Sequence, residues 1–446
     1  MSFTEGEQEV TTNHGLEQQE FGERMRVEAQ ELQSELEKNY KDFHENPELG
    51  GEEKRTSGRV IEELEKLGIE IVGKEIGYKM GTGIVARIKG KQGGPVIALR
   101  ADMDALPIQE DSSHELRSKK DKVMHACGHD AHTTGLLGAA TLLKDLADNG
   151  ELPGDVILLF QPSEEKTHQK ESGSVQMVKF LEEHGLRNEI KAFFGIHVRS
   201  DHERGWVNLK DGIQFGSSGE IDITLKSPGG HIMNAYTEPN LNLIFAEITV
   251  ELDKIFRAAG ESKEALIASG RTNFAGSGYN VLPAAADSTF VVRIASERYR
   301  EIRTDVLNTI QKVVADAVAR HDPTKKVQIE LTPRPGYRPV IHRDPELVKI
   351  ADASVAGTVD DYHRVEVTEN AGEDFCFYLE KFADKQIPGT FVCVGAANPD
   401  KGIPKIGHHT PKFRIDSDVL PEVSALHATL AVNALKYFEN IRRPQN

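Results

Sequence analysis

Three short runs of apolar residues constrain the fold of this chain more than any other feature. They are DVILLFQ at 155–161, KAFFGIHV at 191–198 and GTFVCVG at 389–395. A strand with one face in water alternates apolar and polar residues, so these runs predict strands that are buried on both faces. Helical patterns separate the runs, and strands that alternate with helices predict an α/β fold with a largely covered sheet.

Two more apolar runs come earlier in the chain. The segments 81–90 (GTGIVARIKG) and 95–102 (PVIALRAD) are separated by KQGG, a spacing typical of a β-hairpin. The spacing of apolar residues predicts helices at about 21–43 and 52–67. A further helix is expected after His132.

The pattern changes between about residues 216 and 335. The predicted order there is strand, helix, strand, strand, helix, strand, as in a ferredoxin-like unit. Because buried strands resume afterwards, this unit is expected to be an insertion. The expected organisation is a flexible acidic tail at 1–20, a first segment of the main domain at 21–215, the insertion at 216–335 and a second segment of the main domain at 336–446.

Composition excludes several classes of function. The chain has 446 residues, with 54 Lys and Arg against 71 Asp and Glu, and a net charge of −17. Nucleic acids and anionic membranes bind basic surfaces, so neither is an expected partner. No apolar run approaches the ~18 residues of a membrane-spanning helix, and no signal peptide is recognisable. With only 3 Cys, a disulfide framework is not expected and a cytoplasmic protein is the default.

Polar clusters follow the predicted strands. Asp102 and Asp104 come after PVIALRA, where they would point in one direction if the strand continued, or form a turn. The sequence HACGHDAH at 125–132 then places three His and Cys127 within eight residues. Thiolate and imidazole suit zinc and similar metals, and a single Cys favours an open catalytic site over a closed structural one.

Further candidates lie after the next strands. Glu164 and Glu165 follow DVILLFQ, and adjacent carboxylates repel unless a cation or a proton separates their roles. One would bind a metal while its neighbour acts as general base; the alternative is a helix N-terminus enriched in Glu. His197 ends KAFFGIHV, where an isolated His is more often structural. Ligands in open α/β sheets nevertheless collect at the carboxyl ends of strands. A dinuclear site would need another ligand, for which His408 and His409 are candidates.

The motifs ADMDALPIQE, MHACGHDAHT, FQPSEE, GIHV, SPGGH, NVLP, GEDF and HHTPKF follow one another along the chain. Together they resemble the metal-dependent aminoacylase and carboxypeptidase-like amidohydrolases, specifically the branch of hippurate hydrolase and the plant indole-acetyl–amino acid hydrolases. The resemblance begins at about Phe43 and runs to the C-terminus. It implies a dinuclear-metal catalytic domain, an α/β sandwich around a mixed sheet, with an inserted ferredoxin-like lid.

The resemblance also implies roles for individual residues. The implied metal ligands are Cys127, His129, Glu165, His197 and His409. His409 is chosen over His408 because the ligand of the family lies two residues before the Pro. Glu164 would be the general base and Asp104 the orienting acid, with Asp102 close behind it.

On the lid, His231 of SPGGH would hold the substrate carbonyl, often across a dimer, and Asn280 of NVLP would line the substrate side. The resemblance therefore implies two divalent ions (Zn, Mn, Co or Ni) and a homodimer formed through the lid. The implied reaction is cleavage of the amide of an N-acyl or N-aroyl amino acid or a related small conjugate. The alternatives are a dipeptidase or carboxypeptidase of the same architecture, and a catalytically silent metal-binding relative.

Three segments depart from the family pattern. KTHQKESGS at 166–174 replaces a Gly-rich stretch, IMNAYTEPN at 232–240 replaces small residues and a proline-rich continuation, and Phe290-Val291 replaces Gly-Thr. These segments belong to the expected entrance and lid, so the resemblance predicts catalysis better than it predicts the substrate.

Overall fold

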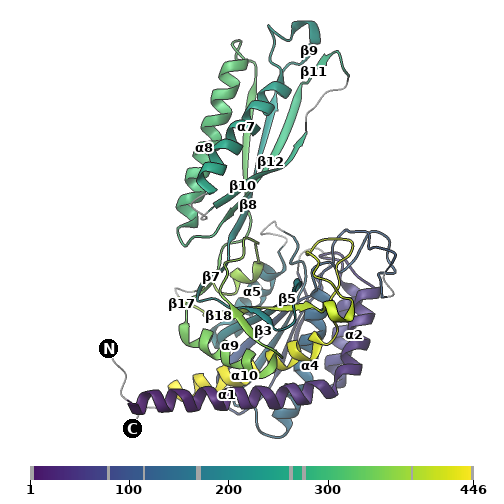
Figure 1. Cartoon of the computed structure of the whole chain (residues 1–446), viewed down its shortest axis with the longest axis vertical. Helices are drawn as coiled ribbons and strands as arrows, with labels where there is room; N and C mark the ends of the chain where they lie inside the picture. The colour runs from purple at the N-terminus through teal and green to yellow at the C-terminus, as the bar shows by residue number, and fades with distance from the viewer. Residues whose placement is uncertain are drawn as a thin grey trace. The chain divides into compact units, whose positions relative to one another are not determined.

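Eight strands form one mixed sheet in the larger of the two units into which the chain divides (Figure 1). Unit 1 comprises Met1–Gln214, Ile341–Val367 and Asp374–Asn446, and unit 2 comprises Phe215–Val340 and Thr368–Glu373. The computed structural model describes residues 5–77, 81–113, 116–166, 172–260, 265–273, 278–382 and 385–442.

The three apolar runs are central strands of this sheet. β3, β4, β5 and β18 run parallel to one another, and every residue of β3 and β18 is buried. The sheet order is β1 (Glu70–Ile76), β2 (Gly83–Ile88), β4 (Asp155–Gln161), β3 (Val96–Asp102), β5 (Ile190–Glu203), β18 (Gly389–Ala397), β6 (Trp206–Asn208) and β15 (His363–Val365). The predicted α/β fold with a buried sheet is confirmed.

The predicted hairpin between 81–90 and 95–102 is wrong. β2 pairs antiparallel with β4, and β3 pairs parallel with the other edge of β4, so β4 separates them. Proximity in sequence favours direct pairing of β2 and β3. A strand as apolar as β4, however, gains more burial between two neighbours than at an edge.

Helices pack against this sheet and against one another. α4 (His129–Asp148) and α10 (Val419–Arg442) contact each other and β3, and α5 (Gly173–Glu183) contacts β4. The other helices of unit 1 are α1 (Glu5–Glu31), α2 (Gln33–Glu45), α3 (Lys54–Lys66), α6 (Leu186–Glu189) and α9 (Pro345–Thr358).

The N-terminal segment differs from the expected tail at 1–20. α1 already begins at Glu5, and the helix expected over 21–43 is interrupted at Leu32, where α2 follows α1. A Cβ built on Gly22 of α1 would lie 3.0 Å from the Cα of Gly357 in α9, so two glycines allow this close helix contact. The long polar start of α1 contains few apolar residues, which is why its pattern did not predict a helix.

Unit 2 has the predicted ferredoxin-like order. Its sheet runs β10 (Ala265–Asn273), β12 (Ala285–Ile294), β8 (Ser217–Lys226) and β13 (Gln328–Pro335), and all neighbours are antiparallel. α7 (Leu241–Gly260) and α8 (Tyr299–His321) bury their apolar residues with those of this sheet in a core separate from that of unit 1.

The remaining elements are short. The strands are β7 (Gly212–Phe215), β9 (Gly230–His231), β11 (Val281–Leu282), β14 (Val340–His342), β16 (Lys381–Phe382) and β17 (Lys385–Gln386), and the 3-10 helices are η1 (Ile232–Asn234), η2 (Asp374–Phe377) and η3 (Pro399–Lys401). Within the described part of the chain, no helix is both long and apolar enough to span a membrane.

Candidate metal centre

The polar clusters meet at one edge of the parallel strands. β3 ends at Asp102, β4 ends three residues before Glu164, and β5 contains His197, while α4 begins at His129. The carboxyl ends of parallel strands share one edge of a sheet, so segments far apart in sequence are brought together there.

Several groups of side chains at this edge could hold a metal ion. In each group, the possible ligand atoms lie within 4.8 Å of one another. Cys127 joins His129 and Glu165 in one group and His197 and His408 in another, whereas a third group contains Asp102, His129 and His132. Cys127 and His129 each belong to two of these groups, so they link the groups into one centre.

A glycine inside the motif HACGHD allows this convergence. Gly128 has φ +97°, and a Cβ on it would lie only 2.4 Å from Cγ2 of Val198. A side chain here would be strained and would collide with β5. Gly128 therefore lets Cys127 and His129 approach the strand that contains His197.

His129 and His197 are oriented as metal-binding imidazoles usually are. Nδ1 of His129 donates to the main-chain oxygen of Asp104 at 2.8 Å, and Nδ1 of His197 donates to the main-chain oxygen of Val198 at 2.7 Å. In each ring, Nε2 is then the nitrogen that is left to face the centre. Nε2 of His197 lies 3.5 Å from Sγ of Cys127, so both rings are set to share a metal with the thiolate.

The charges of the centre reflect its burial. Burial raises the pKa of Cys127, and burial with the neighbouring histidines holds the pKa of His197 well below its usual range. Burial alone would also lower the pKa of His129, but Asp102, Cys127 and Asp104 together outweigh burial and raise it. The His197 imidazole is therefore neutral, and a divalent metal would replace the proton of His129 and that of the Cys127 thiol, because metal ligands bind in their deprotonated form.

Asp104 binds the groups around it rather than pointing outward. Its carboxylate accepts the backbone N–H of Glu164 at 3.1 Å and that of Glu165 at 3.0 Å, and it lies 3.1 Å from Nδ1 of His129. The side chain is buried. Asp104 therefore fixes the paired glutamates and one imidazole relative to each other.

The two C-terminal histidines occupy different environments. Nε2 of His409 lies 3.1 Å from Oε1 of Glu165, and hydrogen bonds with Cys127 and Glu165 raise the pKa of His409 to about 10. Burial lowers the pKa of His408 to about 3, and neither of its buried ring nitrogens has a hydrogen-bond partner in the part of the chain that is described. His408 shares a candidate metal group with Cys127, and His409 hydrogen-bonds to Cys127, so either could serve as the C-terminal metal ligand.

The HACGHDAH motif does not act as one cluster of four ligands. His125 belongs to none of the candidate metal groups among the described residues, and burial lowers its pKa to about 4. His132 does reach the group with Asp102 and His129, but both of its ring nitrogens are already hydrogen-bonded.

One buried histidine lies outside the centre. Nδ1 of His44 is 2.6 Å from Asp130, and Nε2 is 3.1 Å from Glu110. Burial alone would lower the pKa of His44, but hydrogen bonds to the two carboxylates outweigh it and raise the pKa to about 10. His44 is therefore an imidazolium that links α2 to the start of α4.

Sequence reasoning did not single out Glu53. Its buried carboxylate accepts the N–H of Ser163 at 2.9 Å and the hydroxyl of Thr82 at 2.7 Å. Ser163 has φ +54°, so this hydrogen bond supports an unusual backbone turn directly before the paired glutamates. Glu53 lies in the segment GGEE, within the part of the chain from Phe43 onward that resembles the family, and this resemblance was the signal that could have identified it.

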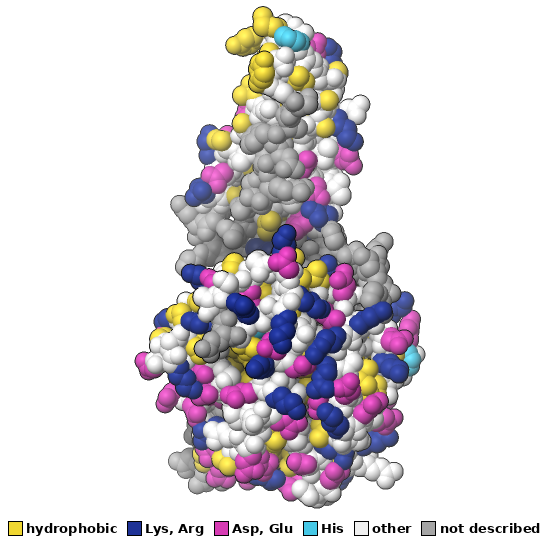
Figure 2. Space-filling model, turned by 90° about the vertical axis from the view of Figure 1, so that its right-hand side faces the viewer, with side chains coloured by type: hydrophobic (Ala, Val, Ile, Leu, Met, Phe, Trp, Pro, Cys, Tyr) yellow, Lys and Arg dark blue, Asp and Glu magenta, His cyan; other side chains and the backbone are white. Residues whose placement is uncertain are grey.

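His231 and Asn280 lie together in unit 2. β9 pairs with β11, with His231 opposite Val281, and the main-chain oxygen of Asn280 accepts the N–H of Ile232. Both side chains are exposed. Figure 2 shows hydrophobic side chains gathered at the end of unit 2 that contains β9 and β11. The large exposed ones near His231 in sequence or across the strand pair are Ile232, Met233, Tyr236, Tyr279 and Val281.

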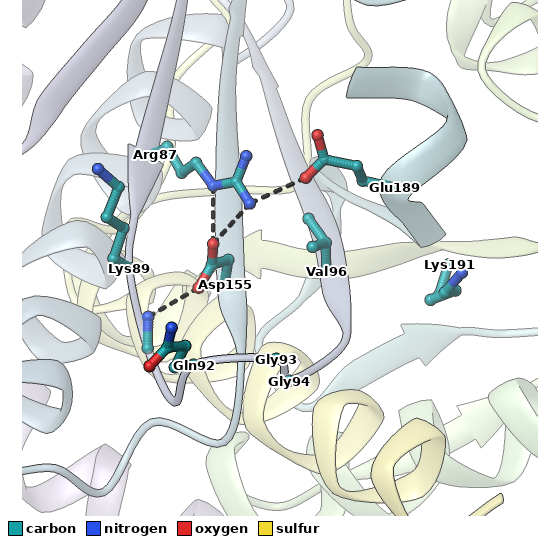
Figure 3. Close-up of a pocket in the computed structure, with 10 residues that line it drawn as sticks. Arg87, Lys89, Gln92, Gly93, Gly94, Val96, Asp155, Glu189 and Lys191 are labelled. Carbon is teal, nitrogen blue, oxygen red and sulfur yellow. Dashed lines mark hydrogen bonds and ion pairs between the residues drawn. The ribbon is translucent and has the colours of Figure 1, made fainter. Parts of the chain in front are cut away.

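A separate hollow of about 440 Å³ lies at the opposite ends of β3 and β4 (Figure 3). Arg87 crosses it and donates to Asp155 at 2.7 Å and to Glu189 at 2.9 Å. Lys89, also on its wall, pairs with Glu70 at 2.6 Å. These charges are satisfied within the protein, and none of the candidate ligands lines this hollow among the described residues.

The fold and the centre together define a two-unit α/β protein with a ferredoxin-like insertion and a thiolate-, imidazole- and carboxylate-lined metal site. The family model described as peptidase family M20/M25/M40 matches residues 98–433. The chain therefore belongs to this peptidase family, and the resemblance drawn from its motifs is confirmed.

Relatives match along most of the chain. N-acetylcysteine deacetylase of Bacillus subtilis is 32% identical over 399 residues, which cover 89% of this chain and 96% of that protein. Thermostable carboxypeptidase 2 of Saccharolobus solfataricus is 31% identical over 415 residues, 92% of this chain and 98% of that protein. IAA-amino acid hydrolase ILR1-like 4 of Arabidopsis thaliana is 32% identical over 403 residues, 88% and 84% of the two chains.

A solved structure shares the architecture. The YXEP protein of Bacillus subtilis, described as a dinuclear metal binding peptidase from the M20 family, superposes with a TM-score of 0.71 at 31% identity. The match covers 91% of this chain and 99% of that one. The shared fold therefore includes both the main sheet and the inserted unit.

Proposed function

We propose that this protein is a metal-dependent hydrolase that cleaves the amide bond of N-acyl or N-aroyl amino acids or related small conjugates. The observation that carries the proposal is the convergence of Cys127, His129, Glu165 and His197, with Glu164 preceding Glu165 in the chain. The names of two relatives, N-acetylcysteine deacetylase and IAA-amino acid hydrolase, support the same reaction class.

Two divalent ions, Zn, Mn, Co or Ni, are the proposed cofactors. The residues proposed to hold them are Cys127, His129, Glu165, His197 and His409. The donor set supports this proposal because thiolate, imidazole and carboxylate suit such ions, and because His129 and His197 each bind a main-chain oxygen through Nδ1, which leaves Nε2 for a metal. When bound, such metals would acidify water and polarise the substrate carbonyl.

The protein side chains would move the protons. Glu164 would take a proton from the attacking water and later deliver it to the leaving nitrogen, as a general base and then a general acid. Asp104 would act as a positioning residue, because its carboxylate accepts the N–H groups of both Glu164 and Glu165. Water is a poor nucleophile and an amide is a poor electrophile. Activation of the water and polarisation of the amide carbonyl are therefore both needed at neutral pH.

Substrate contacts are proposed for unit 2. His231 would hold the carbonyl oxygen and Asn280 would line the substrate side, and their exposure and mutual proximity support this. We also propose a homodimer formed through unit 2. A cytoplasmic location is proposed on the three free cysteines, Cys127, Cys376 and Cys393, all of which are buried.

A second candidate function has a specific observation in its favour. Two relatives named thermostable carboxypeptidase are each 31% identical to this chain over 92% of its length. A dipeptidase would use the same centre but release an amino acid from each side of the amide, and a carboxypeptidase would release the C-terminal amino acid of a peptide. A metal-binding relative without activity is the third alternative, against which the presence of both Glu164 and Glu165 counts.

One assay separates these functions. The purified chain is treated with chelator, reloaded with Zn²⁺, Mn²⁺ or Co²⁺, and incubated with hippurate, N-acetyl amino acids and dipeptides. The proposal expects metal-dependent release of a carboxylic acid and an amino acid. Release of two amino acids from dipeptides alone would favour the peptidase, and no turnover with any metal would favour the silent relative.

The Glu164→Gln variant tests the proposed base. Gln has nearly the same shape as Glu but cannot take a proton, so we expect metal content to be unchanged while kcat falls at least ~100-fold. Metal content is measured alongside turnover. Near wild-type turnover would show that another group is the base.

A further inference from the structure

We infer that His132 is a positioning residue that fixes the metal ligand His197 through the main chain of Val198, and is not a metal ligand itself. The inference rests on the proposed function, because it takes His197 as a ligand. It assigns a role to the last histidine of HACGHDAH, which otherwise belongs to a candidate metal group with Asp102 and His129.

Both nitrogens of His132 are used by the protein. Nε2 accepts the backbone N–H of Val198 at 2.9 Å, so this nitrogen carries no proton. The ring proton is therefore on Nδ1, which donates to Oδ1 of Asp102 at 2.6 Å. The side chain is fully buried, and no ring lone pair is left for a metal.

Asp102 is itself held in place. Its Oδ2 accepts from Nη1 of Arg100 at 2.6 Å, and Arg100 also donates to Asp374 at 2.8 Å and to Gln161 at 2.9 Å. Each of the four side chains is buried. The Asp102 carboxylate is thus committed to Arg100 on one oxygen and to the His132 ring on the other, which keeps the ring in one tautomer and one orientation.

The other end of this chain of hydrogen bonds is His197. β5 pairs with β3 only as far as Gly195, so beyond that point the ring of His132, rather than a strand, accepts the N–H of Val198. The oxygen of Val198 accepts from Nδ1 of His197 at 2.7 Å. The Val198 residue therefore receives one hydrogen bond from His197 and gives one to His132, and the two rings meet edge to face with centroids 4.5 Å apart.

A second histidine supplies a matched control. Nδ1 of His342 donates to the oxygen of Lys210 at 2.7 Å, and its Nε2 accepts the N–H of Phe391 in β18 at 2.9 Å. It is buried and has the same pattern of two hydrogen bonds, but it belongs to none of the candidate metal groups of the described residues. Its loss should weaken the fold without loosening the metal.

The test compares His132→Asn, His132→Gln and His342→Asn in the full-length protein loaded with Co²⁺. Asn keeps a group at the position of Nδ1 but cannot reach Val198, whereas Gln can reach it. The measurements are Co²⁺ per chain, the rate of Co²⁺ loss to a chelator, the visible absorption of the bound Co²⁺ and the thermal unfolding of the metal-free protein.

We expect all three variants to bind as many ions per chain as wild type at saturating Co²⁺. His132→Asn should lose Co²⁺ about 10- to 100-fold faster than wild type with an altered absorption spectrum, as expected when a residue that supports a metal ligand is removed. His132→Gln should restore slow loss. His342→Asn should lower the unfolding temperature but leave the rate and the spectrum unchanged.

Other outcomes would overturn the inference. One ion fewer per chain in His132→Asn would make His132 a ligand, and equal rates in His132→Asn and His342→Asn would leave it a purely structural residue. A wild-type protein that binds no Co²⁺ would refute the proposed function itself, and this inference with it.

Discussion

Replacing Asp104 by Asn is the sharpest test of how the centre is built. The Asp104 carboxylate accepts the N–H of Glu164 on Oδ1 at 3.1 Å and the N–H of Glu165 on Oδ2 at 3.0 Å, and Oδ1 faces Nδ1 of His129 at 3.1 Å. The amide of Asn has one oxygen and one NH₂. In either orientation, at least one of these N–H groups would therefore face another donor instead of an acceptor.

The magnitude follows from these contacts. A hydrogen bond to a charged group contributes about 1.5–3 kcal/mol, and a buried donor left without an acceptor costs about 1–3 kcal/mol. With one such bond lost and the others weakened, we expect a loss of about 2–4 kcal/mol. If this loss falls on the positions of Glu164 and Glu165, kcat/KM decreases roughly 30- to 700-fold at about 1.4 kcal/mol per factor of ten.

The assay is the hydrolysis of the best substrate, with metal content and urea unfolding measured in parallel. Glu53→Gln is the matched control, since Glu53 also contacts this segment, at Ser163. Burial, followed by the charge of Asp104, raises the pKa of Glu53 to about 7. Its carboxyl is therefore substantially protonated near neutral pH, and Gln, which can still accept the Ser163 N–H, should change kcat/KM little. Equal losses in both variants, or no loss in Asp104→Asn, would refute the positioning role.

Three further predictions concern the surroundings of the centre. Gly128→Ala adds a Cβ 2.4 Å from a valine methyl at φ +97°, so unfolding in urea should show a loss of at least ~2 kcal/mol. Gly150→Ala has φ +73° but no atom within 4 Å and should lose only ~1 kcal/mol, so equal losses would contradict the contact argument. The pKa of about 10 for His44 predicts stabilisation that is fully present below its unfolded pKa of about 6.5 and is lost as the pH rises through 10. The free-energy gap between wild type and His44→Gln should therefore shrink by ~2 kcal/mol or more across this range, and a gap independent of pH would be evidence against the imidazolium. Because Nε2 of His409 lies 3.1 Å from Glu165, elemental analysis should find fewer ions per chain in His409→Ala than in His408→Ala, and the reverse result would make His408 the ligand.

Local patterns predicted most of the architecture. The apolar runs of β4, β5 and β18 could be buried only as central strands, and the strand–helix order of 216–335 allowed a ferredoxin-like sheet. Pairing partners were less predictable. β2 pairs with β4 instead of β3 because the apolar strand β4 is buried better between the two than at an edge. β4 lies more than fifty residues beyond the expected hairpin turn, and nothing in the sequence of β2, β3 or the turn indicates that β4 will separate them.

The donor residues of the centre were also predictable, because thiol, imidazole and carboxylate groups at strand ends have few other uses in such numbers. The sequence by itself determined that Cys127, His129 and Glu165 were candidates for one metal site. Only the tertiary structure decided the role of His132, whose partner Val198 lies 66 residues away in sequence. An imidazole has two nitrogens, and which of them remains free depends on hydrogen bonds from strands that fold beside it, so the function of each histidine is a property of the assembled sheet.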